Sequence, residues 1–357
     1  MQSVAIALVG HGAWGEKIAR TLSRLERARL SAVCDVSEPA RERARRAAPD
    51  ARLSASFTEV LARGEARAAI IATPPSTHAA LAHSALEAGL DVMVEKPMAL
   101  RLEEARLLEE TARARGRVLM VGHILEYHPA VVELRRRIDQ GELGEVRLIV
   151  SERLSSSPRR HENAWWSLGP HDVSVLRLLT GGRPTRVSLA GWASDEPGRP
   201  DVVAARVEVG QGPLALAHFS LVHPQKVRRI VVVGSEGVAV FDDLRTEQRL
   251  SWLSGAEVGR GRLDDVVGSA REFEPARQGV RDVLDGVAPS RWLPSGGLCV
   301  PLGDRSPLEL EAEHFVAGVL DGHEVRSDAT SGREVVAVLE AGQRSLDERG
   351  AMEVSRD

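Results

Sequence analysis

The residues best suited to proton chemistry begin with one lysine at the end of an apolar run. Asp91–Glu95 is followed by Lys96 and Pro97, and Lys96 is one of only three lysines in a Lys+Arg total of 47. Arginine keeps its proton in a protein, whereas the pKa of a lysine can be tuned so that the proton is released. Pro97 favours an extended backbone at Lys96 and so fixes its direction. Lys96 is therefore a candidate catalytic residue; the alternative is a surface lysine at a strand end.

A second candidate for proton transfer lies in the segment Ser167–Val173. Pro170 suits the first position of a helix, which would place His171 in the first helical turn. The positive end of the helix dipole disfavours a charged imidazole there, so we expect His171 to be neutral at about pH 7 and able to accept a proton. Asp172, in the same turn, is expected to stabilise the helix start. The alternative is a structural histidine.

A glycine-rich motif near the start of the chain indicates a dinucleotide site. Residues 10–15 read G-H-G-A-W-G; they follow the apolar run Val4–Val9 and open a helical pattern. In a G-x-G-x-x-G motif the first glycine permits a tight turn, the second lets a pyrophosphate approach the backbone, and the third allows close helix packing. The N-terminus of the helix attracts phosphate charge. The residues predicted to contact the cofactor here are Gly10, Gly12, Ala13, Trp14 and Gly15.

An acidic residue decides which dinucleotide fits this motif. Asp35 ends the second apolar run, Leu30–Cys34, twenty residues after Gly15. A carboxylate at this strand end accepts hydrogen bonds from the ribose hydroxyls and would repel a 2′-phosphate. The two residues after Asp35 supply no cation for that phosphate, although Arg41 could swing in from the next helix. NAD is therefore the predicted cofactor rather than NADP.

The first third of the chain alternates short apolar strands with helical patterns, which predicts a parallel, doubly wound Rossmann sheet. The strands expected there are Val4–Val9, Leu30–Cys34, Ala68–Ala72, Asp91–Glu95 and Val118–Gly122. The expected helices are Glu16–Leu25, His78–Ala88 and Leu102–Arg115.

The pattern changes at about residue 145, where longer β-branched runs joined by short loops predict a mainly antiparallel open sheet. Its expected strands are Val146–Glu152, Arg186–Trp192, Val202–Val209, Leu214–Val222 and Val227–Val233. Helices are expected at Pro170–Leu179, Leu308–Leu320 and Arg333–Leu346. The sequence thus predicts an α/β protein with an N-terminal Rossmann domain, residues 1–121, and a C-terminal α+β domain, residues 122–357.

Bulk composition excludes several classes of protein. The 357 residues are 43% hydrophobic and 27% charged, with a formal net charge of -4, which gives no reason to expect nucleic acid or an acidic membrane as partner. No run approaches the roughly 18 apolar residues that a membrane helix needs. The first residues look like a strand rather than a signal peptide, so we expect a cytoplasmic protein. Cys34 and Cys299 are expected to be reduced, and no metal is predicted.

These motifs together resemble the glucose–fructose oxidoreductase, inositol dehydrogenase and rhizopine-catabolism (Gfo/Idh/MocA) family. The matching residues are the 10–15 motif, Asp35, Ala72–His78, Glu95-Lys96-Pro97, Leu168–Asp172 and Pro307–Phe315. The resemblance covers nearly the whole chain except Gly255–Gly297. It implies a Rossmann domain followed by a domain whose open sheet mediates self-association, so a homodimer or homotetramer is expected.

The resemblance also implies roles for individual residues. Lys96 and His171 would lie beside the nicotinamide and the substrate, with Arg153 and Ser167 assigned to substrate binding. The further residues implied to bind the cofactor are Thr73, Pro74, Pro75, His78, Glu95 and Lys96 itself. Most members carry aspartate four residues before the histidine, where this chain has Ser167. A serine cannot hold a charge, so the usual carboxylate–histidine pair is missing.

The segment Trp166–Asp172 looks most like members that act on nucleotide-activated sugars at C3. We therefore expect an NAD-dependent dehydrogenase or reductase in which a substrate hydroxyl bonds Lys96 and His171 and one of the two takes its proton. His171 is favoured for that role, with Lys96 stabilising the developing alkoxide. The loop Ser155–His161, with its two arginines, could grip a substrate phosphate; the alternative is a solvated basic loop.

Three other functions fit parts of this pattern. The first is a cyclitol dehydrogenase of the inositol type. The second is a glycosidase that recycles NAD, and the third is an NAD-sensing protein without turnover. The presence of both Lys96 and His171 favours catalysis over sensing.

Overall fold

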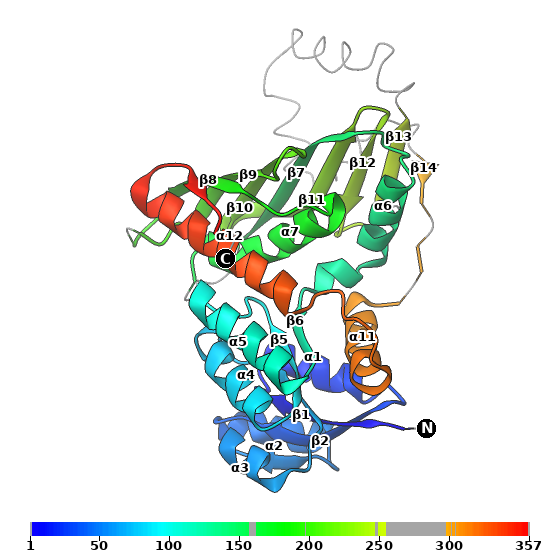
Figure 1. Ribbon diagram of the computed structural model, residues 1–357, viewed down its shortest axis with the longest axis vertical. Helices are drawn as coiled ribbons and strands as arrows, with labels where there is room; N and C mark the ends of the chain where they lie inside the picture. The colour runs from blue at the N-terminus through cyan, green and yellow to red at the C-terminus, as the bar shows by residue number, and fades with distance from the viewer. Residues whose placement is uncertain are drawn as a thin grey trace.

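Two sheets form the framework of the molecule (Figure 1). The computed structural model describes residues 2–156, 162–196, 198–246, 249–254, 298–300, 302–303 and 305–355. A six-stranded sheet belongs to the first third of the chain, and a nine-stranded sheet belongs to the remainder. The predicted combination of a Rossmann sheet and a large open sheet is confirmed.

The first sheet is parallel throughout, with the order β3-β2-β1-β4-β5-β6. Its strands are β1 (Val4–Val9), β2 (Ala28–Cys34), β3 (Arg52–Ser54), β4 (Ala68–Ile71), β5 (Asp91–Glu95) and β6 (Leu119–Gly122). The strand order reverses between β1 and β4, which is where open α/β sheets bind ligands. Residues of β1, β4 and β5 are almost fully buried, as expected for strands covered on both faces.

Helices cover this sheet on both sides. They are α1 (Ala13–Leu22), α2 (Glu38–Ala47), α3 (Phe57–Arg63), α4 (His78–Glu87) and α5 (Leu102–Arg115), with a 3₁₀ turn η1 (Pro75–Thr77) before α4. The first helix was expected from Glu16, but its hydrogen bonds start with the Glu16 amide donating to the Gly12 carbonyl at 2.9 Å. The helix therefore begins at Ala13, inside the glycine-rich motif.

The second sheet has the order β14-β13-β12-β11-β7-β10-β9-β8-β15. Its strands are β7 (Val146–Ser156), β8 (Arg186–Trp192), β9 (Val202–Glu208), β10 (Leu214–Ser220), β11 (Val222–Gly234), β12 (Gly237–Asp242), β13 (Leu250–Ser254), β14 (Leu298–Cys299) and β15 (Met352–Glu353). Neighbours pair antiparallel except β7 and β10, which are parallel. Three helices pack on one face: α6 (Pro129–Asp139), α7 (Ala164–Thr180) and α12 (Ala329–Glu348) (Figure 1).

Helix α7 begins six residues before its predicted start, which corrects the expectation for Pro170. The side-chain oxygen of Asn163 accepts from the Trp166 amide at 3.0 Å and caps the helix, so Pro170 lies inside it. The longer helix buries Trp165, whose ring packs on Phe219 with centroids 5.7 Å apart. Burial of a large aromatic side chain outweighs the local preference of proline for a helix start.

The last third of the chain returns to the first sheet. Helix α11 (Pro307–Asp321) packs against α1 and against the 3₁₀ turn η2 (Ile124–Tyr127) that follows β6. Its last residue, Asp321, accepts two hydrogen bonds from Arg27, at 2.7 and 2.8 Å. Both halves of the sequence therefore contribute to the region around the ends of β5 and β6.

Candidate active site

The glycine-rich loop has the shape of a phosphate cradle. Gly10 has φ of +93°, and a Cβ there would lie 2.5 Å from the Ala72 carbonyl oxygen, so the position needs glycine. A Cβ at Gly12 would meet no atom within 4 Å, and Gly12 is exposed at the N-terminal cap of α1. Backbone and helix terminus thus face open space, which fits a dinucleotide pyrophosphate.

Asp35 lies directly beside this loop. Its carboxylate accepts from the His11 amide at 2.6 Å and from the Ser37 amide at 2.8 Å. Arg41 donates to the carbonyl oxygens of Asp35 and Val36 at 2.7 and 3.0 Å. The carboxylate lies next to the glycine-rich loop, the Arg41 guanidinium is engaged by the backbone, and the ribose contact of Asp35 stays a prediction.

The loop after β4 is joined to the loop after β5 by His78. One ring nitrogen of His78 bonds the Thr73 carbonyl and the other bonds the Pro97 carbonyl, each at 2.8 Å. Burial lowers the pKa of His78, while these two carbonyls raise it. The ring is 1% exposed, so it braces the loops from inside. Pro74 is exposed and Pro75 partly buried on the other side of that brace.

Lys96, Ser167 and His171 come together at the carboxyl end of β5. The Lys96 ammonium donates to the Ser167 carbonyl oxygen at 3.2 Å. Ser167 and His171 are four residues apart on α7, which places them on the same side of the helix. The Lys96–Pro97 peptide bond is cis. Lys96 therefore contacts α7 one helical turn from His171, the other predicted proton-transfer residue.

His171 is held neutral, but the predicted cause was wrong. It lies two turns into α7 rather than at the helix start. Burial, followed by the positive charges of Lys96, Arg153, Arg228 and the nearby His123, holds the pKa of His171 well below its usual range. The neutral imidazole has a ring nitrogen that can take a proton, while burial and the surrounding positive charges oppose the protonated form.

Asp172 does not cap the helix, which corrects the prediction that it stabilises the helix start. Its carboxylate accepts from Arg153 Nε at 2.6 Å and Nη2 at 3.3 Å, and from the Ser151 hydroxyl. The side chains of Arg153 and Asp172 are each 5% exposed. This buried ion pair fixes α7 against β7 next to His171, while the assignment of Arg153 to substrate binding stays a prediction.

Two basic side chains near His171, His123 and Arg228, were not predicted from the sequence. His123 directly follows β6, the strand beside β5, and ligands bind beyond such strand ends. Arg228 pairs in register with Arg153 across β11 and β7. Residues 230–233 are all apolar, so the sequence carries no alternation that would have placed Arg228 on the helix-facing side.

Several other observations bound the site. Residues 157–161 of the predicted phosphate-gripping loop, and the segment 255–297, lie outside the described residues. Within the described residues, no cluster of three or more His, Cys, Asp or Glu side chains could hold a metal, and no helix is long and apolar enough to cross a membrane.

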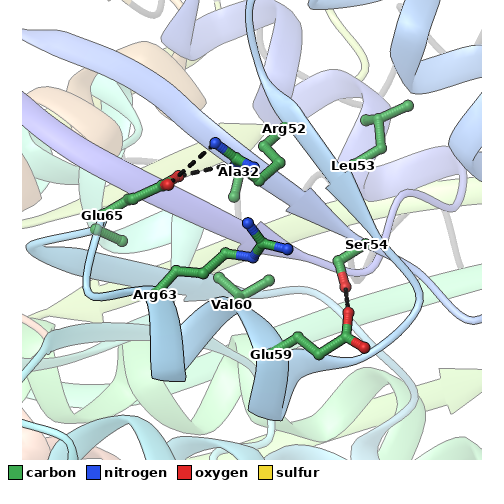
Figure 2. Close-up of a pocket in the computed structure, with 9 residues that line it drawn as sticks. Ala32, Arg52, Leu53, Ser54, Glu59, Val60, Arg63 and Glu65 are labelled. Carbon is green, nitrogen blue, oxygen red and sulfur yellow. Dashed lines mark hydrogen bonds and ion pairs between the residues drawn. The ribbon is translucent and has the colours of Figure 1, made fainter.

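A cavity of about 110 Å³ lies beside β3, an edge strand of the first sheet (Figure 2). Strand β5 lies next to the opposite edge of that sheet. Arg52 pairs with Glu65 at 3.1 Å and Ser54 bonds Glu59 at 3.0 Å within the cavity. Much of its polar lining is thus already satisfied internally, and it does not contain the candidate residues.

A dinucleotide cradle beside a lysine–histidine pair defines an oxidoreductase with an NAD-binding Rossmann domain. Sequence comparison agrees. An oxidoreductase family with an NAD-binding Rossmann fold matches residues 4–123, and the C-terminal domain of the GFO/IDH/MocA proteins matches residues 131–240. The chain belongs to the GFO/IDH/MocA family.

Its relatives include sugar and cyclitol dehydrogenases. The UDP-N-acetylglucosamine 3-dehydrogenase of Acidithiobacillus ferrooxidans is 29% identical over 312 residues, 87% of this chain and 88% of the relative. Its crystal structure superposes with a TM-score of 0.78 at 26% identity, covering 98% of this chain and 99% of that one. The scyllo-inositol 2-dehydrogenase (NAD(+)) of Bacillus subtilis is 29% identical over 280 residues, 74% of this chain and 80% of the relative.

Proposed function

We propose that this protein is an NAD-dependent dehydrogenase or reductase that acts on a secondary alcohol or ketone at C3 of a nucleotide-activated or amino sugar. The observation that carries the proposal is the contact of Lys96 with the Ser167 carbonyl, one helical turn from a neutral His171. The likeness to UDP-N-acetylglucosamine 3-dehydrogenase supports the sugar and the carbon.

The residues of the chain divide the work as follows. The loop at Gly10 and Gly12 would hold the pyrophosphate of NAD, and Asp35 would accept its ribose hydroxyls. The nicotinamide, when bound, supplies the hydride chemistry. His171 takes the proton of the substrate hydroxyl, and the Lys96 ammonium stabilises the negative charge that develops on the same oxygen. In the reverse direction the same two groups serve the ketone.

A homo-oligomer is the proposed assembly. The sheet face opposite α7 and α12 carries an apolar stripe, because Val150 lies between Leu216 and Val231 in register, and Val231 lies beside Val240. These side chains are partly exposed, whereas most of the neighbours that alternate with them are buried. We propose that a second copy of the chain covers this stripe.

The test is NADH formation by the purified protein with a panel of nucleotide sugars, free sugars and inositols. A UDP-sugar is expected to be oxidised best, and Lys96→Met should lower turnover roughly a hundredfold or more while NAD still binds. Lys96→Arg should also fail, because the larger, planar guanidinium cannot occupy the position of the compact ammonium. A Lys96→Met enzyme with near-normal turnover would overturn the proposed role.

A cyclitol dehydrogenase is the second candidate, favoured by the likeness to scyllo-inositol 2-dehydrogenase. The same panel separates the two, because an inositol would then give the largest kcat/KM. Release of an aglycone from a glycoside without net NADH would instead indicate a glycosidase that recycles NAD.

A further inference from the structure

Three buried glutamates from three elements lie behind the candidate site. Glu95 ends β5, Glu126 lies in η2 and Glu311 lies in α11; they are 8%, 2% and 0% exposed. A buried histidine, His123, lies 3.5 Å from the Glu126 carboxylate. The proposed proton transfer at Lys96 and His171 uses none of them.

Glu95 is the member of this group that is tied to the site. Its carboxylate accepts from the indole N–H of Trp14 and, at 3.3 Å, from the Lys96 amide. Trp14 lies in the first turn of α1, inside the glycine-rich motif. Gly122 pairs with Glu95 in register, and a Cβ there would lie 2.9 Å from Glu95 Oε1. The absence of a side chain at Gly122 therefore leaves room for the carboxylate.

Glu311 differs from Glu95 in its surroundings. Within the described part of the chain neither of its oxygens accepts a hydrogen bond. Burial, together with the charges of Glu95 and Glu126, raises the pKa of Glu311 well above its usual range. Burial also raises the pKa of Glu95, but the Trp14 hydrogen bond and the Lys96 charge oppose that rise. Like charges in a buried cluster cannot all ionise, and the carboxylate with donors keeps its charge.

We propose that Glu95 is a positioning residue that couples the dinucleotide loop to Lys96 through Trp14, while its buried neighbour Glu311 carries the proton of the cluster. The Trp14 indole fixes one carboxylate oxygen of Glu95, and the other oxygen accepts from the backbone amide of Lys96. A shift of the glycine-rich loop is thereby transmitted to the lysine. The part of this proposal that concerns turnover rests on the proposed function of Lys96.

A double-mutant cycle tests the coupling. Trp14→Phe, Glu95→Gln and the double variant are compared for the NAD dissociation constant by calorimetry and for kcat. Each single change should lower kcat about ten- to a hundredfold, the range for a hydrogen bond to a charged group. The double variant should be no slower than Glu95→Gln alone. Losses that multiply, or a Trp14→Phe enzyme with altered NAD binding and unchanged kcat, would overturn the coupling.

Glu311→Gln is the matched control, because glutamine has the size of a neutral glutamic acid. It should leave both kcat and the NAD dissociation constant within about twofold of the wild type. A loss as large as that of Glu95→Gln would overturn the assignment of the proton.

Gly122→Ala provides a second probe if Glu95→Gln folds poorly. The added methyl group presses on the Glu95 carboxylate and should lower kcat while the side chains of Trp14 and Lys96 are kept. An unchanged kcat in this variant would count against the positioning role. Trp14→Phe and Glu95→Gln should also weaken NAD binding, and the double variant should bind no more weakly than Glu95→Gln alone. Because NAD binding is measured without turnover, the cycle then reports the coupling even if Lys96→Met shows that the proposed function is wrong.

Discussion

At the scale of single residues, the candidate site holds two basic groups that our proposal brings to one substrate oxygen. The Lys96 ammonium is oriented by a backbone carbonyl and would lie next to the substrate. His171 is surrounded by positive groups, so it is neutral before the reaction and becomes charged only as a proton arrives. The developing alkoxide lies between them in our proposal, and its negative charge offsets the second positive charge.

We propose that the choice between NAD and NADP depends on Asp35. Asp35→Ser should weaken NAD binding roughly ten- to a hundredfold and relieve the repulsion of NADP. Part of this loss arises because the same carboxylate holds the His11 amide of the glycine-rich loop. Asp35→Asn is the matched control, since it keeps an acceptor of similar size but removes the charge. Calorimetry on the wild type measures its affinities for NAD and NADP, and tighter binding of NADP than of NAD would refute the assignment.

In the proposed mechanism, the pH dependence of oxidation depends on His171. Because its pKa lies below the usual value of 6.5, the base is neutral across neutral pH, and kcat/KM should fall only below that value. Ser167→Asp places a carboxylate one turn away, which should raise the pKa of His171 and move the acid limb to higher pH. Ser167→Asn, without a charge, should leave the limb in place, and His171→Asn should remove it. A limb that does not move in Ser167→Asp, together with a raised KM, would limit Ser167 to shaping the pocket.

At the scale of elements, α7 is held by a buried ion pair with β7. Asp172→Asn leaves the Arg153 guanidinium buried without its counter-charge, which should lower the free energy of unfolding by about 3–5 kcal/mol. Urea unfolding measures the loss, and Arg153→Met in the same chain should restore part of it. The exposed pair Arg20–Glu16 is the comparison, where Glu16→Gln should cost less than about 1 kcal/mol. Equal losses at the two pairs would show that Asp172 does not brace the helix.

The sequence predicted elements well where the local signal was complete. The bounds of β5, α5 and β8 match, since each is a clear apolar or periodic run, and α5 ends at Gly116 in the left-handed conformation. Helix α2 was not predicted, because only Ala40 and Ala44 are buried on an otherwise polar, arginine-rich helix.

The candidate site was predicted from motifs, but its electrostatics could not be. Arg153 and Asp172 are 19 residues apart, and Lys96 and Ser167 are 71 apart. Contacts at that separation depend on how β7 and α7 pack, which local patterns do not encode. The neutrality of His171 was therefore inferred from a helix terminus, although burial against the second sheet causes it.

At the scale of the whole molecule, α11 brings the last part of the chain back to the N-terminal domain. This helix packs against α1, and Arg27 with Asp321 links the last third of the chain to the first. Glu311 reaches the end of β5 only because of this return. The Rossmann sheet comes from the first third of the chain alone, whereas the carboxyl cluster behind it combines residues from the first third and from α11.

The apolar stripe on the open sheet leads to a prediction about the assembly of the protein. Val231 lies at its centre, between Val150 and Val240. In a two-fold interface each copy would present the same stripe, so Val231→Glu would bury a charge twice per dimer. We expect the wild type to be a dimer or tetramer by light scattering at micromolar concentration, and Val231→Glu to be a monomer.

Leu107→Glu is the control for this change, because Leu107 is a 50% exposed apolar residue on α5, outside the second sheet. It should leave the mass unchanged, which separates loss of the interface from a general effect of added charge. Stable interfaces bury about 1,200–2,000 Å², an area that a sheet of nine strands can supply. A monomeric wild type, or a Val231→Glu protein that keeps the wild-type mass, would show that this face is not where copies of the chain meet.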